Sequence, residues 1–231
     1  MDGVKIRYNN IQKNSNSFTT NYGFLSYYGA SNATVGQAEI AYNTVVGNNL
    51  AANATYGIQI GYFTGGVSLH DNYVRGTNRL LYMYGNTWEG NATYKTRIYN
   101  NQFIQENGTS ALQGVLYIAS NGTDPVVADV VHNNVVINSV TGSGAAGVVF
   151  QNAGVQDSLV FANNNIYTLA GAIPVLIYAT PGANGLVDRN NYRADNASWY
   201  AGVYNTTAGN WSIFSDKSSW YAATGMDTNS V

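Results

Sequence analysis

The chain has 231 residues, of which 45% are hydrophobic and only 10% are charged. Ten basic residues stand against twelve acidic ones, and there is no cysteine. This composition excludes a disordered chain, disulfides, zinc fingers, iron–sulfur clusters and thiol nucleophiles, and its near-neutral charge argues against nucleic acid as a partner.

The first predicted strands begin almost at once, around a hexapeptide in which two apolar residues flank an asparagine. Residues 6–11 read IRYNNI, with Ile6, Asn9 and Ile11 at its first, fourth and sixth positions. The same spacing occurs seven times in chain order, at intervals of 26 to 34 residues, and its asparagines are Asn9, Asn43, Asn72, Asn101, Asn133, Asn164 and Asn190. Such a period indicates an internal repeat, and about 30 residues fit a solenoid coil of three short strands better than a propeller blade.

The repeated asparagine has a physical explanation in a solenoid. Stacked coils lie about 4.8 Å apart, so its amide can bond to the same residue one coil away and form a ladder. We also predict that this asparagine supplies the positive φ at the bend between two strands. The residues three before it and two after it should face the core. The residues four before it should face solvent: Lys5, Glu39, Ser68, Arg97, Asp129, Val160 and Leu186.

A second type of strand follows a glycine in several units, as at Gly57, Gly114 and Gly147. Its alternating pattern predicts Ile58/Ile60, Val115/Tyr117, Val148/Phe150 and Val175/Ile177 inward, and Leu116, Val149 and Leu176 outward. An apolar outward stripe needs a cover. We predict that the C-terminal segment folds back on the stripe with its three tryptophans, Trp199, Trp211 and Trp220. The alternative is an interface with another protein.

The asparagine repeat resembles the right-handed parallel β-helix proteins of the pectate-lyase-like superfamily over about residues 4–192. Residues 219–230, SWYAATGMDTNS, are similar to the W-x-x-x-T-G-x-D-x-x-S segment that often follows the last coil in secreted bacterial members. The resemblance implies an all-β, right-handed parallel β-helix solenoid of about seven coils over residues 1–195. A C-terminal cap over residues 196–231 would include a short helix near Ser215–Ala223.

The sequence also leads to an expectation about where the protein is located. No run of 18 apolar residues occurs, so we expect no membrane insertion. The chain enters its first strand without a leader, and we expect it to be a piece of a longer extracellular or cell-surface protein.

Nineteen tyrosines are many for a chain of this length. Aromatic rows on a rigid β face can stack on sugar rings, because each ring combines an apolar face with a polar tip. The alternative is that tyrosine, a good strand residue, simply serves the core and surface of a weakly charged protein. The candidate carbohydrate-binding residues are Tyr27, Tyr28, Tyr56, Tyr62, Tyr82 and Tyr84.

The densest ionisable cluster combines His70 and Asp71 with Arg75 and Arg79, and His132 follows two coils later. A His/Asp/Arg group could abstract a proton beside a uronate carboxylate, which is lyase chemistry. The alternative is a solvated turn with local salt bridges. The catalytic candidates are therefore His70, Asp71, Arg75 and His132.

The aspartates do not complete a known constellation. Pectate-lyase types resemble one another in an acidic calcium site with an arginine base, and polygalacturonase types in three clustered aspartates. Asp124, Asp129 and Asp157 match neither pattern. We therefore predict no metal site and no cofactor, with calcium on loop Asp and Asn oxygens as an open alternative.

Three functions stay open. The first, which we favour, is a non-catalytic surface module that binds polysaccharide through outward aromatic residues. The second is a structural spacer, adhesin or filament subunit that self-associates through its coil ends or the apolar outer stripe. The third is a fragment of a polysaccharide lyase or hydrolase.

Overall fold

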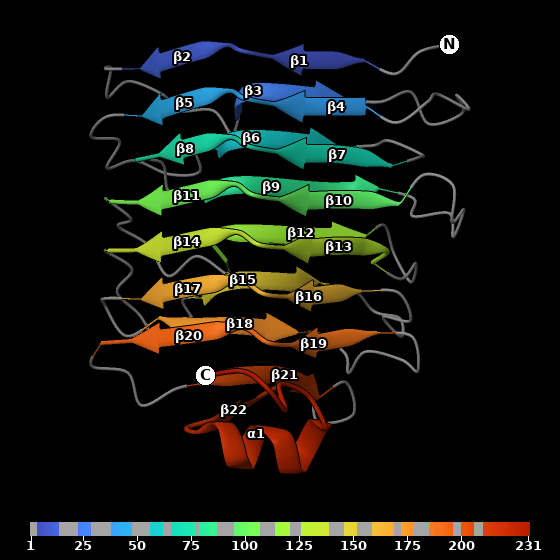
Figure 1. The fold of residues 1–231 in the computed structure, drawn as a ribbon, viewed down its shortest axis with the longest axis vertical. Coiled ribbons are helices and arrows are strands. Elements are labelled where there is room, and N and C mark those ends of the chain that lie inside the picture. Colours follow the sequence, from blue (N-terminus) through green and yellow to red (C-terminus); the bar gives the residue numbers. More distant parts are fainter. Residues whose placement is uncertain are drawn as a thin grey trace.

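A computed structural model describes residues 4–13, 23–28, 38–47, 56–61, 66–76, 79–86, 95–106, 114–120, 126–138, 146–151, 159–168, 172–177, 185–195, 200–205 and 210–231. These residues form a stack of short strands that ends in one helix (Figure 1). The predicted all-β parallel solenoid with an asparagine ladder and a short C-terminal helix is confirmed.

Three sheets run along the stack. Sheet A consists of β1 (Lys5–Arg7), β4 (Ala38–Ala41), β7 (Val67–His70), β10 (Thr96–Tyr99), β13 (Ala128–Val131), β16 (Val160–Ala162) and β19 (Leu186–Asp188). Sheet B consists of β2 (Asn10–Lys13), β5 (Thr44–Gly47), β8 (Tyr73–Arg75), β11 (Gln102–Gln105), β14 (Asn134–Ile137), β17 (Asn165–Thr168) and β20 (Asn191–Ala194). Every strand pair in these two sheets is parallel and joins successive coils.

Sheet C closes the third side. It consists of β3 (Gly23–Tyr28), β6 (Tyr56–Gly61), β9 (Arg79–Asn86), β12 (Leu116–Ser120), β15 (Ala146–Gln151), β18 (Ile173–Ile177), β21 (Ala201–Asn205) and β22 (Asn210–Phe214). Its strands are parallel except for the last pair, in which β22 runs antiparallel to β21.

The apolar residues of the repeat fill the core, as predicted. Ile40 and Leu69 precede their ladder asparagines by three residues, Val45 and Phe103 follow theirs by two, and all four are fully buried. In the predicted outward column, Lys5, Arg97 and Leu186 are exposed, and Glu39, Ser68, Asp129 and Val160 are half-buried.

The ladder runs through all seven asparagines. In the first six, Nδ2 donates to the Oδ1 of the next asparagine, over 2.8–3.0 Å. The main-chain N–H of each of these asparagines donates to the same oxygen. Asn43 to Asn190 are buried, whereas Asn9 is exposed.

The prediction that the ladder asparagine has positive φ is wrong. The left-handed residue is the one before it, with φ of 53° to 58° at Tyr8, Tyr42, Asp71, Asn100, His132, Asn163 and Arg189. The side-chain amide of the ladder asparagine instead spans this residue and donates to the carbonyl two residues before the asparagine. Asn72 Nδ2 donates to the carbonyl of His70 over 2.9 Å, and Asn101 Nδ2 to that of Tyr99 over 3.0 Å. The asparagine therefore stabilises the bend with its side chain.

Sheet C departs from simple alternation where each strand begins. Two consecutive residues face inward there, as the full burial of Leu80 and Leu81 shows. Gly57 occupies the first of these positions, and a Cβ on it would lie 2.5 Å from the core atom Val74 Cγ1. Because of this extra inward residue, Leu116 pairs with Val148 in the core and Tyr117 lies on the outer face. The predicted outward Leu116 and inward Tyr117 were wrong.

The outer stripe of the later coils is covered by the chain itself. Val149 and Leu176 are 0% and 1% exposed and form a small apolar cluster outside the main core. Trp211 and Ile213 of β22 pack against this cluster, so the C-terminal segment contacts the stripe from the end of the same sheet. Trp199 lies outside the described residues.

The helix α1 (Lys217–Thr224) closes the C-terminal end. It begins at Asp216, whose side chain accepts the N–H of Ser219 over 2.8 Å, and ends at Gly225, which has a φ of 72°. Trp220 is fully buried and meets Phe214 edge-on, with ring centroids 5.4 Å apart. The helix thus packs its one large apolar side chain under the last strands.

The ladder ends on the C-terminal motif. Ser230 Oγ accepts the N–H of Asn190 over 2.8 Å, and Asp227 Oδ1 lies 3.4 Å from Asn190 Nδ2. Asp227 also accepts the indole N–H of Trp220 over 2.9 Å, so the motif residues meet in one buried network. The division of the chain into residues 1–195 and 196–231 stays a prediction.

Candidate functional site

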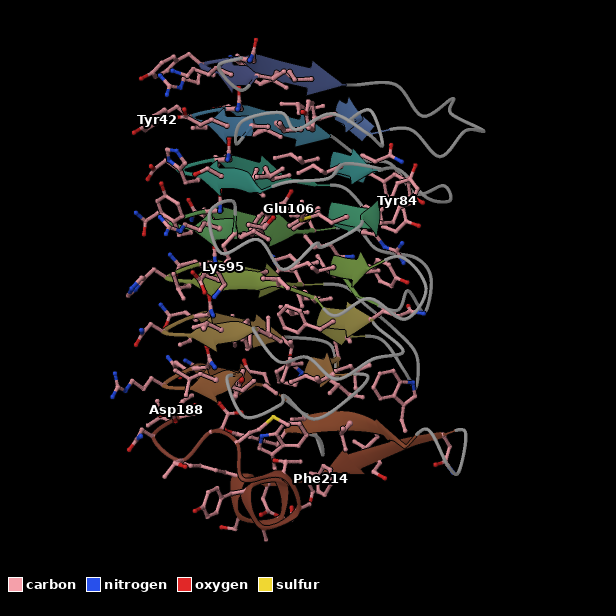
Figure 2. All side chains as sticks on the ribbon, turned by 90° about the vertical axis from the view of Figure 1, so that its right-hand side faces the viewer. Tyr42, Tyr84, Lys95, Glu106, Asp188 and Phe214 are labelled. Atoms are coloured by element: carbon pink, nitrogen blue, oxygen red, sulfur yellow. The ribbon has the colours of Figure 1, made fainter. Side chains whose placement is uncertain are left out.

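Five side chains gather on the outer face of sheet C, and we call them the Arg79–tyrosine cluster: Arg79, Tyr56, Tyr82, Tyr84 and Tyr117. Strand pairing brings them together, because Tyr56 pairs with Arg79 between β6 and β9, and Tyr82 pairs with Tyr117 between β9 and β12. Tyr84 lies on the opposite side of the solenoid from Tyr42 (Figure 2).

Tyr82 is the centre of the cluster. Its ring stacks on that of Tyr56, with centroids 4.4 Å apart, and on that of Tyr84 at 4.6 Å. The ring of Tyr117 lies 5.3 Å away on the next coil. The guanidinium carbon of Arg79 lies 4.7 Å from the Tyr82 centroid and 4.6 Å from that of Tyr117, which is cation–π distance.

The cluster is partly accessible. Tyr56 is buried, whereas Tyr82, Tyr84 and Tyr117 are half-buried. Burial lowers the pKa of Arg79 and raises the pKa of Tyr56, although the nearby Arg79 charge opposes the shift of Tyr56. Arg79 Nε donates to the carbonyl of Gly114 over 3.2 Å.

Polar groups rim the rings. The hydroxyl of Tyr117 donates to Gln151 Oε1, and Gln59 Nε2 lies 3.5 Å from the hydroxyl of Tyr84. The cluster therefore combines aromatic surface with hydroxyl and amide groups that can bond to a polar ligand.

The predicted tyrosines separate into three groups. Tyr56, Tyr82 and Tyr84 lie together, as above. Tyr27 pairs with the core residue Ile60, and its half-buried side chain packs against the main core. The side chain of Tyr28 and all of Tyr62 lie outside the described residues.

Sequence reasoning missed two members of the cluster. It grouped Arg79 with His70, and it placed Tyr117 in the core. The signal that could have found Tyr117 is the pair of adjacent apolar residues at Leu80–Leu81 and at Val115–Leu116, which marks the extra inward residue.

His70 is held between two carboxylates on sheet A. Its Nδ1 lies 2.8 Å from Asp71 Oδ2, and its Nε2 lies 3.3 Å from Glu39 Oε1. Its ring also stacks on Tyr99, with centroids 4.7 Å apart, and is only slightly exposed. A hydrogen bond from Arg7 and the neighbouring His70 hold the pKa of Glu39 below its ordinary value. Both ring nitrogens of His70 thus have carboxylate partners, and the contact with Glu39 joins two successive coils. The catalytic role of His70 stays a prediction.

The other catalytic candidates lie elsewhere. Arg75, on sheet B, pairs with Glu106 over 2.7 Å. His132 is exposed at the bend after β13, and β10 separates that strand from β7. Arg79 belongs to sheet C. The structure does not bring these groups to one site.

The aspartates do not gather either. Asp129 forms an ion pair with Lys95, and Asp124 and Asp157 lie outside the described residues. Within the described part of the chain, no three His, Asp or Glu side chains are arranged to hold a metal ion.

No protein-family model, no curated protein and no solved structure matches the chain. No helix among the described residues is long and apolar enough to cross a membrane.

Proposed function

We propose that the chain is a secreted or cell-surface β-solenoid that binds polysaccharide through the Arg79–tyrosine cluster without catalysing a reaction on it. The observation that supports this function is the stacking of Tyr56, Tyr82 and Tyr84, three of the six candidate sugar-binding residues, into one group. Stacked rings keep a fixed orientation, so a ligand that binds them does not have to order them first.

The geometry favours an extended ligand. The cluster draws its members from β6, β9 and β12, which are neighbours in sheet C and lie about 4.8 Å apart. A sugar chain that runs along the solenoid axis would therefore meet aromatic edges and hydroxyls on successive coils.

The same proposal places the chain among right-handed parallel β-helices of the pectate-lyase-like kind. Its support is the asparagine ladder together with the buried Trp220, Asp227 and Ser230 of the C-terminal motif. The extracellular location depends on this likeness.

The test is a glycan array with the full chain, followed by calorimetric titration of the best ligand. We expect Tyr84→Ala and Tyr82→Ala each to weaken binding about tenfold or more, since loss of a central aromatic costs more than about 1.4 kcal/mol. The matched control is Tyr221→Ala, because Tyr221 is 47% exposed on α1 at the C-terminal end of the solenoid, whereas the cluster lies on β6, β9 and β12.

Three results would contradict the proposal. They are an array with no bound glycan, an equal loss of binding in Tyr221→Ala, and release of unsaturated uronides from pectin or alginate, which would indicate a lyase. Circular dichroism of each variant shows whether a loss of binding comes from a loss of fold.

A further inference from the structure

A second column of amide side chains runs along the outer face of sheet B. It takes one residue from each of four successive strands, β11, β14, β17 and β20 (Figure 1). Strand pairing places these residues in register, and all of them are exposed: Gln102, Asn134, Asn165 and Asn191. We call them the outer amide column. Its members lie about 4.8 Å apart, which is the spacing of neighbouring strands.

Hydrogen bonds between coils order the outer amide column. Asn165 Nδ2 donates to Asn134 Oδ1 over 2.9 Å, and Asn191 Nδ2 lies 3.4 Å from Asn165 Oδ1. An asparagine amide has two N–H groups and two acceptor lone pairs, so these contacts use only half of the bonding capacity of Asn165. Because the amides already hold one another in place, a ligand that binds them loses little affinity to ordering them.

An apolar column runs beside the amides. Its members lie two residues further along the same strands, are in register and are half-buried: Ile104, Val136 and Tyr167. Two residues of a strand span about 7 Å, so the two columns form one narrow strip along the solenoid axis. The residues between them, such as Phe103 and Val135, are buried in the core, which places both columns on the outer face.

The strip carries no charge on β11, β14 and β17. Charged residues occur at its two ends, and they form ion pairs with each other. Arg75 on β8 lies 2.7 Å from Glu106, and Arg193 on β20 lies 3.4 Å from Asp195. An ionic ligand on this strip would give up its hydration without gaining a counter-charge, so an uncharged ligand fits better.

A second copy of the chain fits this face poorly. Sheet B has seven strands of three or four residues, so its outer face measures about 30 Å by about 13 Å, or about 400 Å². A stable protein interface buries about 800 Å² on each partner. The long and narrow shape instead matches a ligand that is a single extended chain wide.

We propose that this strip binds an uncharged, extended polysaccharide of the cellulose type, which lies along the solenoid axis. The rings of such a chain have apolar faces, which pack on the apolar column, and hydroxyl edges, which exchange hydrogen bonds with the amides. The straight row of coils in register favours a straight chain over a coiled one. The strip lies on sheet B and the Arg79–tyrosine cluster on sheet C, so it is a second site, and the two proposals can fail independently.

The test is a nuclear magnetic resonance titration of the full, isotopically labelled chain with cellohexaose, a straight and uncharged glucan. We expect the largest shifts at the side-chain amides of Asn134 and Asn165, because these groups bond to the sugar hydroxyls. Two comparison ligands separate shape from charge. Maltohexaose has the same sugar units in a coiled chain, and hexagalacturonate carries a carboxylate on every unit. We expect each of them to bind at these amides at least tenfold more weakly than cellohexaose.

Substitutions on the outer face test each column. Asn134→Ala combined with Asn165→Ala removes the centre of the amide column and should weaken cellohexaose binding about tenfold. Val136→Lys places a charge in the apolar column and should weaken it by a similar factor. The matched control is Asn210→Ala, because Asn210 is an exposed asparagine on β22 of sheet C and should not affect binding. Circular dichroism shows whether each variant keeps the fold.

Several results would overturn the proposal. They are a lack of cellohexaose binding, an equal loss of binding in Asn210→Ala, and equally strong binding of maltohexaose or hexagalacturonate at Asn134 and Asn165. Shifts confined to Tyr82 and its neighbours would assign the ligand to the Arg79–tyrosine cluster instead. A dimer of the unmodified chain that dissociates in Val136→Lys would assign the strip to a second copy.

Discussion

Replacing Asn101 by alanine tests whether the ladder holds the coils together. Asn101 is 1% exposed. Its Nδ2 donates to the carbonyls of Leu69 and Tyr99 and to Asn133 Oδ1, and its Oδ1 accepts both amide groups of Asn72. The substitution leaves the main-chain N–H of Asn72 and these carbonyls without that partner. A buried unsatisfied group costs about 1–3 kcal/mol, so we expect the free energy of unfolding to fall by about 2–5 kcal/mol.

The matched control is the same substitution at the end of the same ladder. Asn9 is exposed, and among the described residues its side chain bonds only to the carbonyl of Arg7 and to Asn43 Oδ1, which keeps the bond from Asn9 N. We expect Asn9→Ala to cost less than about 1 kcal/mol, because water replaces the lost partners. Urea unfolding followed by tryptophan fluorescence measures both variants. Equal losses in the two variants, or a loss below about 1 kcal/mol for Asn101→Ala, would refute the reasoning.

Two further substitutions test other buried polar groups. Gln105 is fully buried in register with Ile137, and its amide has no hydrogen-bond partner among the described residues. Gln105→Leu should therefore raise the free energy of unfolding by about 1–2 kcal/mol, whereas Gln102→Leu, at an exposed position of the same strand, should change it little. A loss of stability in Gln105→Leu would show that the amide has a partner. Burial raises the pKa of Asp188, but hydrogen bonds from the side chain and main chain of Asn229 outweigh it and hold the pKa below its ordinary value. The resulting stabilisation is present above about pH 3.9 and is lost as the pH falls through the folded-state pKa. From pH 6 to pH 3, the melting temperature should therefore fall more for the unmodified chain than for Asp188→Asn. Parallel curves of melting temperature against pH for the two proteins would contradict this.

The fold could be predicted because one residue type recurs once in every coil. The ladder bonds join identical side chains, so the interval between asparagines in the sequence equals the length of a coil. The predicted position of the left-handed residue was wrong by one residue. Asparagine tolerates the left-handed region better than most residue types, so the sequence favoured it over the preceding residue, which is for example Tyr42 or Arg189. Sequence alone does not reveal that the amide acts on its neighbour's backbone.

The predicted inward and outward positions in sheet C were wrong for a different reason. Gly57 and Gly147 both face inward, where a Cβ would meet core side chains. Gly114 lies one position earlier, with a φ of 91°, so it marks another point of the strand. Treating these glycines as one landmark shifted β12 by one residue, and such a shift moves every side chain to the other face.

The candidate site was partly predictable. The tyrosines on β6 and β9 could be grouped because strands one coil apart become neighbours. Arg79 was assigned to the wrong group because Arg75 and Arg79 are close in sequence but lie on β8 and β9, in different sheets. At such a corner, sequence neighbours point in different directions.

The ladder also explains why one edge of the solenoid is so variable. A left-handed conformation costs about 1–2 kcal/mol for most residues, yet every coil adopts it just before the ladder asparagine. The amide that spans this residue contributes buried hydrogen bonds that offset the cost. The position therefore does not need glycine, and its side chains point outward: Tyr8, Tyr42, Asn100, His132, Asn163 and Arg189 are all exposed. The most regular residue of the fold thus supports a column of mostly exposed side chains that differ from coil to coil.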